Sequence, residues 1–348
     1  MDYRINSLDI LRAFAIICMI QVHVFYFWTN NNYGFVNLII IFFGNLAAPF
    51  FLIVSGSSFF LFICKKKETN ISKLEIFKDV LIRAIFIFIV TLLFQLLFGF
   101  ILGIHISFII YWSIFQVITF SMILYFFLPF LKRNIRLIII TSLFFLIYLL
   151  YYLIKFFSIK YISILISGGE FTFLPWTSFF IFGILIGDLI INTSYNYLKT
   201  LFKIFFLIGI IILFFWWFII KELPLEMYVI TFLAAFSVFF IFFPLNYYLI
   251  DIKKLQSQFA SRLIHWGRFS FSIYYIQFTI IAVGVLVFPF IIPDLFSKGF
   301  LIYQFLIIIT MFYIGIDLFL KIWKKVNYIF SIEWFLNLIN KKTLFSKP

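Results

Sequence analysis

The sequence has few charged residues, few cysteines and few histidines. Asp, Glu, Lys and Arg make up 11% of the 348 residues, whereas a soluble domain has about 25%. So little charge leaves too little polar surface to cover a water-soluble core, which excludes a cytosolic enzyme and a disordered protein. Two cysteines cannot form the framework of a disulfide-stabilised secreted domain. Three scattered histidines, His23, His105 and His265, argue against a metal site.

Hydrophobic residues, in contrast, make up 65% of the chain, and the mean hydropathy is +1.18. A membrane-spanning helix needs about 20 apolar residues in a row. Ten runs fit that length: 8–28, 36–63, 80–103, 107–131, 137–157, 173–191, 201–220, 227–250, 269–292 and 299–323. They are too long and too uniformly apolar for transmembrane strands. We therefore expect an all-α, polytopic membrane protein with about ten transmembrane helices.

The basic residues predict how these helices are oriented. The net charge of +14 does not indicate a nucleic-acid partner, because Lys and Arg lie in short clusters between apolar runs. With the N-terminus in the cytoplasm, 23 of the 27 Lys and Arg residues fall on the cytoplasmic side. This bias follows the positive-inside rule and predicts that both termini are cytoplasmic. We expect a multi-pass protein of the cell membrane with one domain over residues 1–330 and a short cytoplasmic tail over 331–348.

Ionisable residues interrupt the first apolar run. Asp9, Arg12 and His23 lie in it, and a charge at the bilayer centre costs at least about 2.5–3.5 kcal/mol. On an ideal helix Arg12 and His23 share a face, about 16 Å apart along the axis. Asp9 is three residues before Arg12 and can pair with it. If this face points into the protein, it outlines a polar path from the inner to the outer side.

Structural readings of the same residues stay open. Asp9 and Arg12 lie near the membrane surface and could be an interfacial anchor. His23 could be a hydrogen-bonded core histidine. A buried neutral imidazole can also accept a proton as a general base, which is the functional reading.

Five motifs resemble the transmembrane acyltransferase superfamily. The first is Arg12, ten residues and His23, which is similar to the motif of the membrane O-acyltransferase branch. Three others, Asn45–Ser58, Tyr111–Met122 and Leu174–Gly187, resemble motifs of the heparan-alpha-glucosaminide N-acetyltransferase-like catalytic family. The last, Trp266–Gln277, resembles a motif found in several branches of the superfamily. Together these motifs extend over most of the chain.

This resemblance implies an acyltransferase that uses cytosolic acyl-CoA, with acetyl-CoA as the expected donor. The acceptor would be a hydroxyl or amine of an extracytoplasmic sugar or glycan. His23 would be the catalytic base, either in direct transfer or as an acyl-histidine relay. Acetyl-CoA would be a co-substrate, with no permanently bound cofactor and no metal. The expected partners are the lipid bilayer, acyl-CoA and the glycan; the sequence leaves a homodimer open.

The resemblance also assigns donor- and substrate-binding residues. They are Asp9, Arg12, Asn45, Ser55, Gly56, Lys78, Arg83, Trp176 and Gln277. Several have a structural alternative. Lys78 and Arg83 could be positive-inside anchors, the Ser55–Gly56 patch could allow close helix packing, and Trp176 could belong to an aromatic belt.

Two other functions fit the helices alone. A transporter or flippase for a polar or lipid-linked sugar would use a polar face on the first helix. Ion-coupled transporters, however, usually have carboxylates near the membrane midplane, and only Asp317 comes close to that position. A non-catalytic scaffold would leave the shared face of Arg12 and His23 without a purpose.

Overall fold

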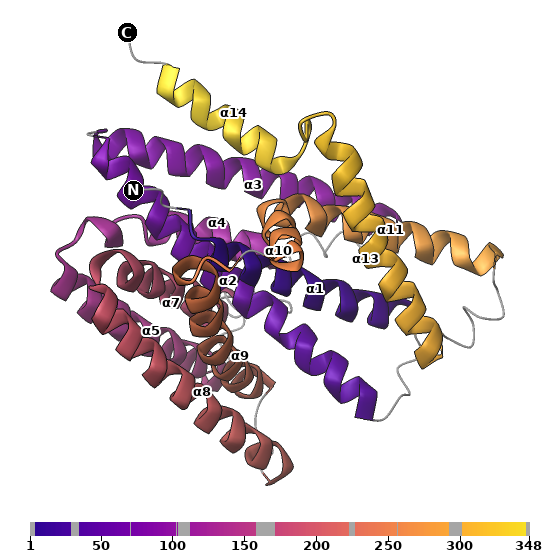
Figure 1. Cartoon of the computed structure of the whole chain (residues 1–348), viewed down its shortest axis with the longest axis horizontal. Coiled ribbons are helices and arrows are strands. Elements are labelled where there is room, and N and C mark those ends of the chain that lie inside the picture. The colour runs from indigo at the N-terminus through magenta and orange to yellow at the C-terminus, as the bar shows by residue number, and fades with distance from the viewer. Residues whose placement is uncertain are drawn as a thin grey trace. The chain divides into compact units, whose positions relative to one another are not determined.

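A computed structural model describes residues 4–28, 35–69, 71–101, 103, 112–157, 171–222, 227–255, 257–291 and 301–345. Every secondary-structure element in these ranges is helical (Figure 1). The α-helices are α1 (Asn6–Trp28), α2 (Phe35–Glu68), α3 (Lys73–Ile101), α4 (Ile114–Leu124), α5 (Arg133–Phe156), α7 (Phe173–Asn192), α8 (Tyr195–Glu222), α9 (Met227–Asn246), α10 (Gln258–Arg268), α11 (Ser270–Ile291), α13 (Ile302–Lys324) and α14 (Ile332–Phe345). A 3₁₀ turn, η2 (Leu128–Phe130), follows α4, and a π-helical turn, η3 (Tyr247–Ile252), follows α9.

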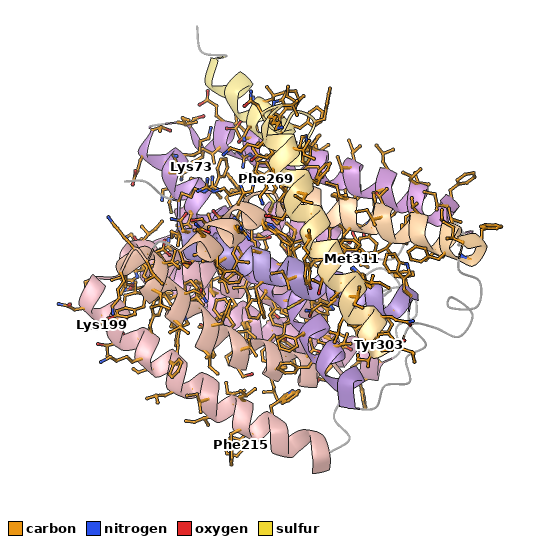
Figure 2. All side chains as sticks on the ribbon, turned by 45° about the vertical axis from the view of Figure 1, so that its right-hand side comes forward. Lys73, Lys199, Phe215, Phe269, Tyr303 and Met311 are labelled. Carbon is orange, nitrogen blue, oxygen red and sulfur yellow. The ribbon has the colours of Figure 1, made fainter. Side chains whose placement is uncertain are left out.

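Within the described ranges, nine helices are long and apolar enough to cross a membrane. They are α1, α2, α3, α5, α7, α8, α9 with η3, α11 and α13. This confirms the predicted all-α, multi-pass fold. Exposed apolar side chains agree with it: Figure 2 shows Phe215 of α8 pointing away from the neighbouring helices, and Met311 of α13 is exposed too. In a bilayer such side chains face hydrocarbon rather than water.

The predicted run at 107–131 differs from the others. Its described part is only the 11-residue helix α4 and the turn η2. Ser113 starts α4 with a capping box, in which its side chain accepts from the Gln116 backbone and the Gln116 side chain accepts from the Ser113 backbone. Such a cap fixes a helix start at this point. His105 and Tyr111, named in the sequence analysis, lie outside the described residues.

The chain forms two compact units. We call Pro49–Pro244 the central unit, and Ile5–Ala48 with Leu245–Pro348 the terminal unit. The helix α2 contributes its first part to the terminal unit and its second part to the central unit. The terminal unit therefore joins segments from both ends of the chain. The prediction of one domain over residues 1–330 remains a prediction.

In the central unit, small residues let α2 and α7 approach very closely. A Cβ atom at Gly56 would lie 2.0 Å from the Phe180 carbonyl oxygen, and one at Gly183 would lie 2.1 Å from the Ile53 carbonyl oxygen. Ser57 links the same two helices, because its hydroxyl donates a hydrogen bond to the Gly183 carbonyl at 2.9 Å. Glycine is the residue that allows helix backbones to meet at this distance.

In the terminal unit, α1 packs against α10, η3, α11 and α13 (Figure 1). The backbone N–H groups of Asn6 and Ser7, which begin α1, donate to the carboxylate of Asp251 at 2.9 and 3.0 Å. A carboxylate from a distant part of the sequence thus accepts hydrogen bonds from backbone N–H groups that have no partner within the helix. Its negative charge also interacts favourably with the positive end of the helix dipole.

A second carboxylate accepts hydrogen bonds from the backbone N–H groups that begin α11. Glu333, at the start of α14, accepts from the backbone N–H groups of Phe271 and Ser272 and from the Ser272 hydroxyl. Burial raises the pKa of the Glu333 carboxyl, although these three donors oppose the shift. The segment predicted as a short tail is therefore helical from Ile332 to Phe345 and is attached to the first turn of α11.

Candidate functional site

An ion-paired carboxylate lies in the first turns of α1. Arg12 forms a salt bridge with Asp9, as their spacing of three residues predicts. The Nε atom of Arg268 in α10 lies 3.8 Å from the other Asp9 oxygen. The Asp9 side chain is 3% exposed and that of Arg12 is 20% exposed. One buried carboxylate therefore lies between two guanidinium groups.

Gly267 explains why Arg268 reaches Asp9. A Cβ atom at Gly267 would lie 1.8 Å from the Asp9 carbonyl oxygen, so the backbones of α10 and α1 touch at this point. Any side chain at position 267 would separate the two helices. The close contact places the end of α10 beside the charged turn of α1.

His23 lies further along α1, against α11. Its ring centroid is 4.2 Å from that of Phe278, with the rings tilted by 47°. Its Nδ1 atom is buried and has no hydrogen-bond partner among the described residues. The described residues thus give no support to the reading of His23 as a fully hydrogen-bonded core histidine. A nitrogen without a protein partner is suited to exchange a proton with a substrate.

Asn45 of α2 lies in the same unit. A Cβ atom at Gly44 would lie 2.6 Å from the Cβ of Val22, so α2 touches α1 one residue before His23. Asn45 follows Gly44 directly and is half-buried. Asn45 thus follows directly the residue of α2 that touches α1 beside His23.

Gln277 of α11 is fully buried, with 0% of its surface exposed. Neither its amide oxygen nor its amide nitrogen has a hydrogen-bond partner among the described residues. A buried polar group without a partner costs about 1–3 kcal/mol. The next residue, Phe278, is the one that contacts His23. His23 Nδ1 and the Gln277 amide, which have no hydrogen-bond partner among the described residues, thus belong to α1 and α11 near the contact of His23 with Phe278.

The remaining predicted residues belong to the central unit. Gly56 is explained by the contact of α2 with α7, which fits the packing alternative for the Ser55–Gly56 patch; Ser55 itself is half-buried. Trp176 is buried against Phe171 and Phe179, and its indole N–H has no partner among the described residues. The roles of Ser55 and Trp176 in substrate binding remain predictions.

Lys78 and Arg83 differ in their surroundings. Lys78 is exposed. The Arg83 guanidinium lies 4.0 Å from the ring centroid of Phe62, and the Lys66 amino group lies over the same ring at 5.8 Å. Lys66 also pairs with Asp79 at 3.0 Å. The structure therefore groups Arg83 with a lysine from the end of α2, a residue that the sequence analysis did not select.

The sequence analysis also did not identify the buried ion pair of the central unit. Asp188 of α7 is 0% exposed and pairs with Arg136 of α5, whose side chain is 6% exposed. Arg133 lies 3.3 Å from the second Asp188 oxygen, and the Asn192 amide donates to the first at 2.8 Å. The pairing depends on the contact between α5 and α7, which no local spacing reveals. Asp317, in contrast, pairs with Lys321 at 2.7 Å in an i, i+4 spacing that the sequence does show.

The ten predicted site residues thus divide between the units. The terminal unit holds Asp9, Arg12, His23, Asn45 and Gln277, and the central unit holds Ser55, Gly56, Lys78, Arg83 and Trp176. Among the residues that the structure describes, no group of three His, Cys, Asp or Glu side chains could hold a metal ion. The predicted residues of the terminal unit are an imidazole, two amides and the Asp9–Arg12 ion pair.

Comparison with known protein families finds a match. The model of the family described as "Heparan-alpha-glucosaminide N-acetyltransferase, catalytic" matches residues 4–219, which is more than half of the chain. No curated protein matches the chain significantly. The matched region includes every predicted site residue except Gln277.

Proposed function

We propose that this chain, which belongs to the heparan-alpha-glucosaminide N-acetyltransferase catalytic family, is an acetyltransferase. It transfers an acetyl group from cytosolic acetyl-CoA to an extracytoplasmic sugar or glycan. Family membership supports the general function, that of a membrane acyltransferase. The donor, the acceptor and the residue roles are our proposal. The observation that carries it is that His23 lies inside the matched region with a buried ring nitrogen that has no partner among the described residues.

In this mechanism neutral His23 is the general base. A hydroxyl or amine of the acceptor attacks the thioester carbonyl carbon, and His23 takes the proton that the acceptor loses. The carbon–sulfur bond then breaks, and the proton passes from His23 to the sulfur of CoA. The products are the acetylated acceptor and free CoA. Holding both reactants beside one base makes proximity a large part of the rate enhancement.

Arg12 is proposed to contact a phosphate group of the donor. Its guanidinium group pairs with the buried Asp9 carboxylate beside a second guanidinium group, that of Arg268, and the Arg12 side chain is partly exposed. A guanidinium group binds phosphate oxygens through charge-assisted hydrogen bonds. The interfacial-anchor reading predicts instead that Arg12 affects stability and orientation in the membrane but not the donor.

Replacing Arg12 with Ala separates these readings. We expect the Kd for acetyl-CoA to rise about tenfold or more, because a hydrogen bond to a charged group contributes about 1.5–3 kcal/mol. The kcat at saturating donor should change much less. Equilibrium binding of labelled acetyl-CoA to the purified protein measures the first quantity. Arg262→Ala, which removes an exposed arginine from α10, is the matched control, and an unchanged Kd in Arg12→Ala would return Arg12 to the anchor role.

The proposed reaction is tested with the purified protein in detergent. Radiolabelled acetyl-CoA is incubated with a panel of amino sugars, neutral sugars and glycans, and labelled products are separated. We expect label on at least one acceptor, and its position on oxygen or nitrogen assigns the type of transfer. If no acceptor is labelled but the reconstituted protein moves a sugar or a lipid-linked sugar across vesicles, the transporter or flippase alternative replaces this proposal.

A further inference from the structure

Gln277 has an environment that packing alone does not explain. Its side chain is fully buried, yet neither amide atom has a hydrogen-bond partner among the described residues. Two buried glutamines of the central unit are paired with each other: the Gln116 amide donates to Gln95 at 3.2 Å. A buried amide without a partner is destabilising unless a bound molecule satisfies it. The described residues supply no such group, which points to a ligand.

The register of the helices places Gln277 at the level of His23. Three contacts relate α1 to the α10–α11 segment: Asp9 with Gly267, His23 with Phe278 and Trp28 with Gly284. The paired positions differ by 258, 255 and 256 residues, so the two segments run parallel with a nearly constant offset. Gln277 therefore lies level with the turn of α1 that ends at His23. The imidazole and the amide both come from this level of the terminal unit.

The two groups differ in what they can do for a reaction. A neutral imidazole nitrogen can take a proton, whereas an amide remains neutral and offers N–H donors. A thioester under attack develops negative charge on its carbonyl oxygen. An N–H donor held in a water-poor site stabilises that charge more than the neutral carbonyl of the ground state. The amide nitrogen of Gln277 is a donor of this kind.

We infer that Gln277 is a further catalytic residue, whose Nε2–H donates a hydrogen bond to the thioester carbonyl oxygen during transfer. This inference rests on the proposed function. The acceptor atom forms a bond to the carbonyl carbon, the electron pair of the carbonyl moves to oxygen, and Gln277 stabilises this oxyanion. His23 holds the acceptor proton at that stage. When the carbonyl re-forms, the carbon–sulfur bond breaks and the proton passes to the leaving sulfur.

The test is a Gln277→Leu variant, assayed for acetyl transfer to the best acceptor of the panel. We expect the kcat to fall by about 10²- to 10³-fold, which is the usual effect of removing one oxyanion donor. The KM for acetyl-CoA and the Tm should stay near the wild-type values, because replacing an amide without a protein partner by an apolar group removes no stabilising hydrogen bond. Should Gln277→Leu fail to fold, Gln277→Met, which is unbranched and lacks the amide, takes its place.

A matched control uses the same substitution at a paired glutamine. Gln95→Leu removes the partner of the Gln116 amide and should lower the Tm while leaving the kcat unchanged. A wild-type kcat in Gln277→Leu would overturn the inference, as would a lower Tm with a raised KM, since both would then reflect a structural role. An inactive wild-type protein would contradict the proposed function itself, whereas an active wild type with an active Gln277→Leu variant contradicts only the role of Gln277.

Discussion

Replacing His23 with Ala is expected to lower the kcat for acetyl transfer by about 10²- to 10⁴-fold, which is the contribution of a positioned general base. The affinity for acetyl-CoA should change little, because the proposed phosphate contact is made by Arg12, 11 residues earlier in α1. The Tm should fall somewhat, because Ala loses the ring contact with Phe278, but His23 Nδ1 has no hydrogen bond to lose among the described residues. Turnover of labelled acetyl-CoA and equilibrium binding of the donor measure the two effects on the same preparation.

His265→Ala is the matched control for this variant. His265 belongs to the same unit, but it shares a hydrogen bond with the Tyr328 hydroxyl at 3.0 Å. We therefore expect a loss of stability there and retained kcat. Unchanged turnover in His23→Ala would remove His23 as the base. Trapping of labelled acetyl on the wild-type protein, absent in His23→Ala, would favour the acyl-histidine relay over direct transfer.

The second large effect concerns stability. Asp188→Ala should lower the free energy of unfolding by about 3–5 kcal/mol, the usual cost of removing one partner of a buried ion pair. The reason is that Arg136 would remain buried without the carboxylate to which its guanidinium donates. Thermal unfolding of the purified protein in detergent measures the change as a fall in Tm.

Arg133→Ala provides the comparison for this prediction. Its side chain is 40% exposed, and its distance to the Asp188 carboxylate is 3.3 Å. Because the Arg133 guanidinium is partly solvated, its pair with the buried Asp188 should contribute less than the Arg136 pair, and this variant should lower the Tm less than Asp188→Ala does. If Asp188→Ala and Arg133→Ala lowered the Tm equally, the buried Arg136–Asp188 pair would contribute no more to stability than the partly exposed Arg133 contact.

The fold was largely predictable from the apolar runs, because a bilayer requires long uninterrupted helices. The run at 107–131 is the exception, since its helix begins only after Ser113, and the sequence contains a pattern that indicates this start. Ser113 and Gln116 have the spacing of a capping box, and the structure starts α4 there. Counting apolar residues alone missed it, since a helix cap in the middle of an apolar run does not lower the hydropathy.

The site was predictable only where it depends on local spacing. The Asp9–Arg12 pair follows from three residues on one helix. The Arg136–Asp188 pair and the attachment of Glu333 to α11 join residues 52 and 62 positions apart. Such pairings depend on how the helices pack, which the spacing of residues along the sequence does not reveal. That Gln277 is buried without a hydrogen-bond partner among the described residues could not be predicted for the same reason, since burial of an amide depends on all its neighbours.

The terminal unit has a consequence for biosynthesis. Its first helix emerges from the ribosome early, yet the carboxylate that caps Asn6 follows 245 residues later, and Arg268 follows later still. Until then α1 must remain in the bilayer without the Asp251 carboxylate and the Arg268 guanidinium that contact its first turns in the folded protein. Assembly of the terminal unit thus waits for the last membrane insertions, so a chain released too early has α1 but not the helices that pack against it.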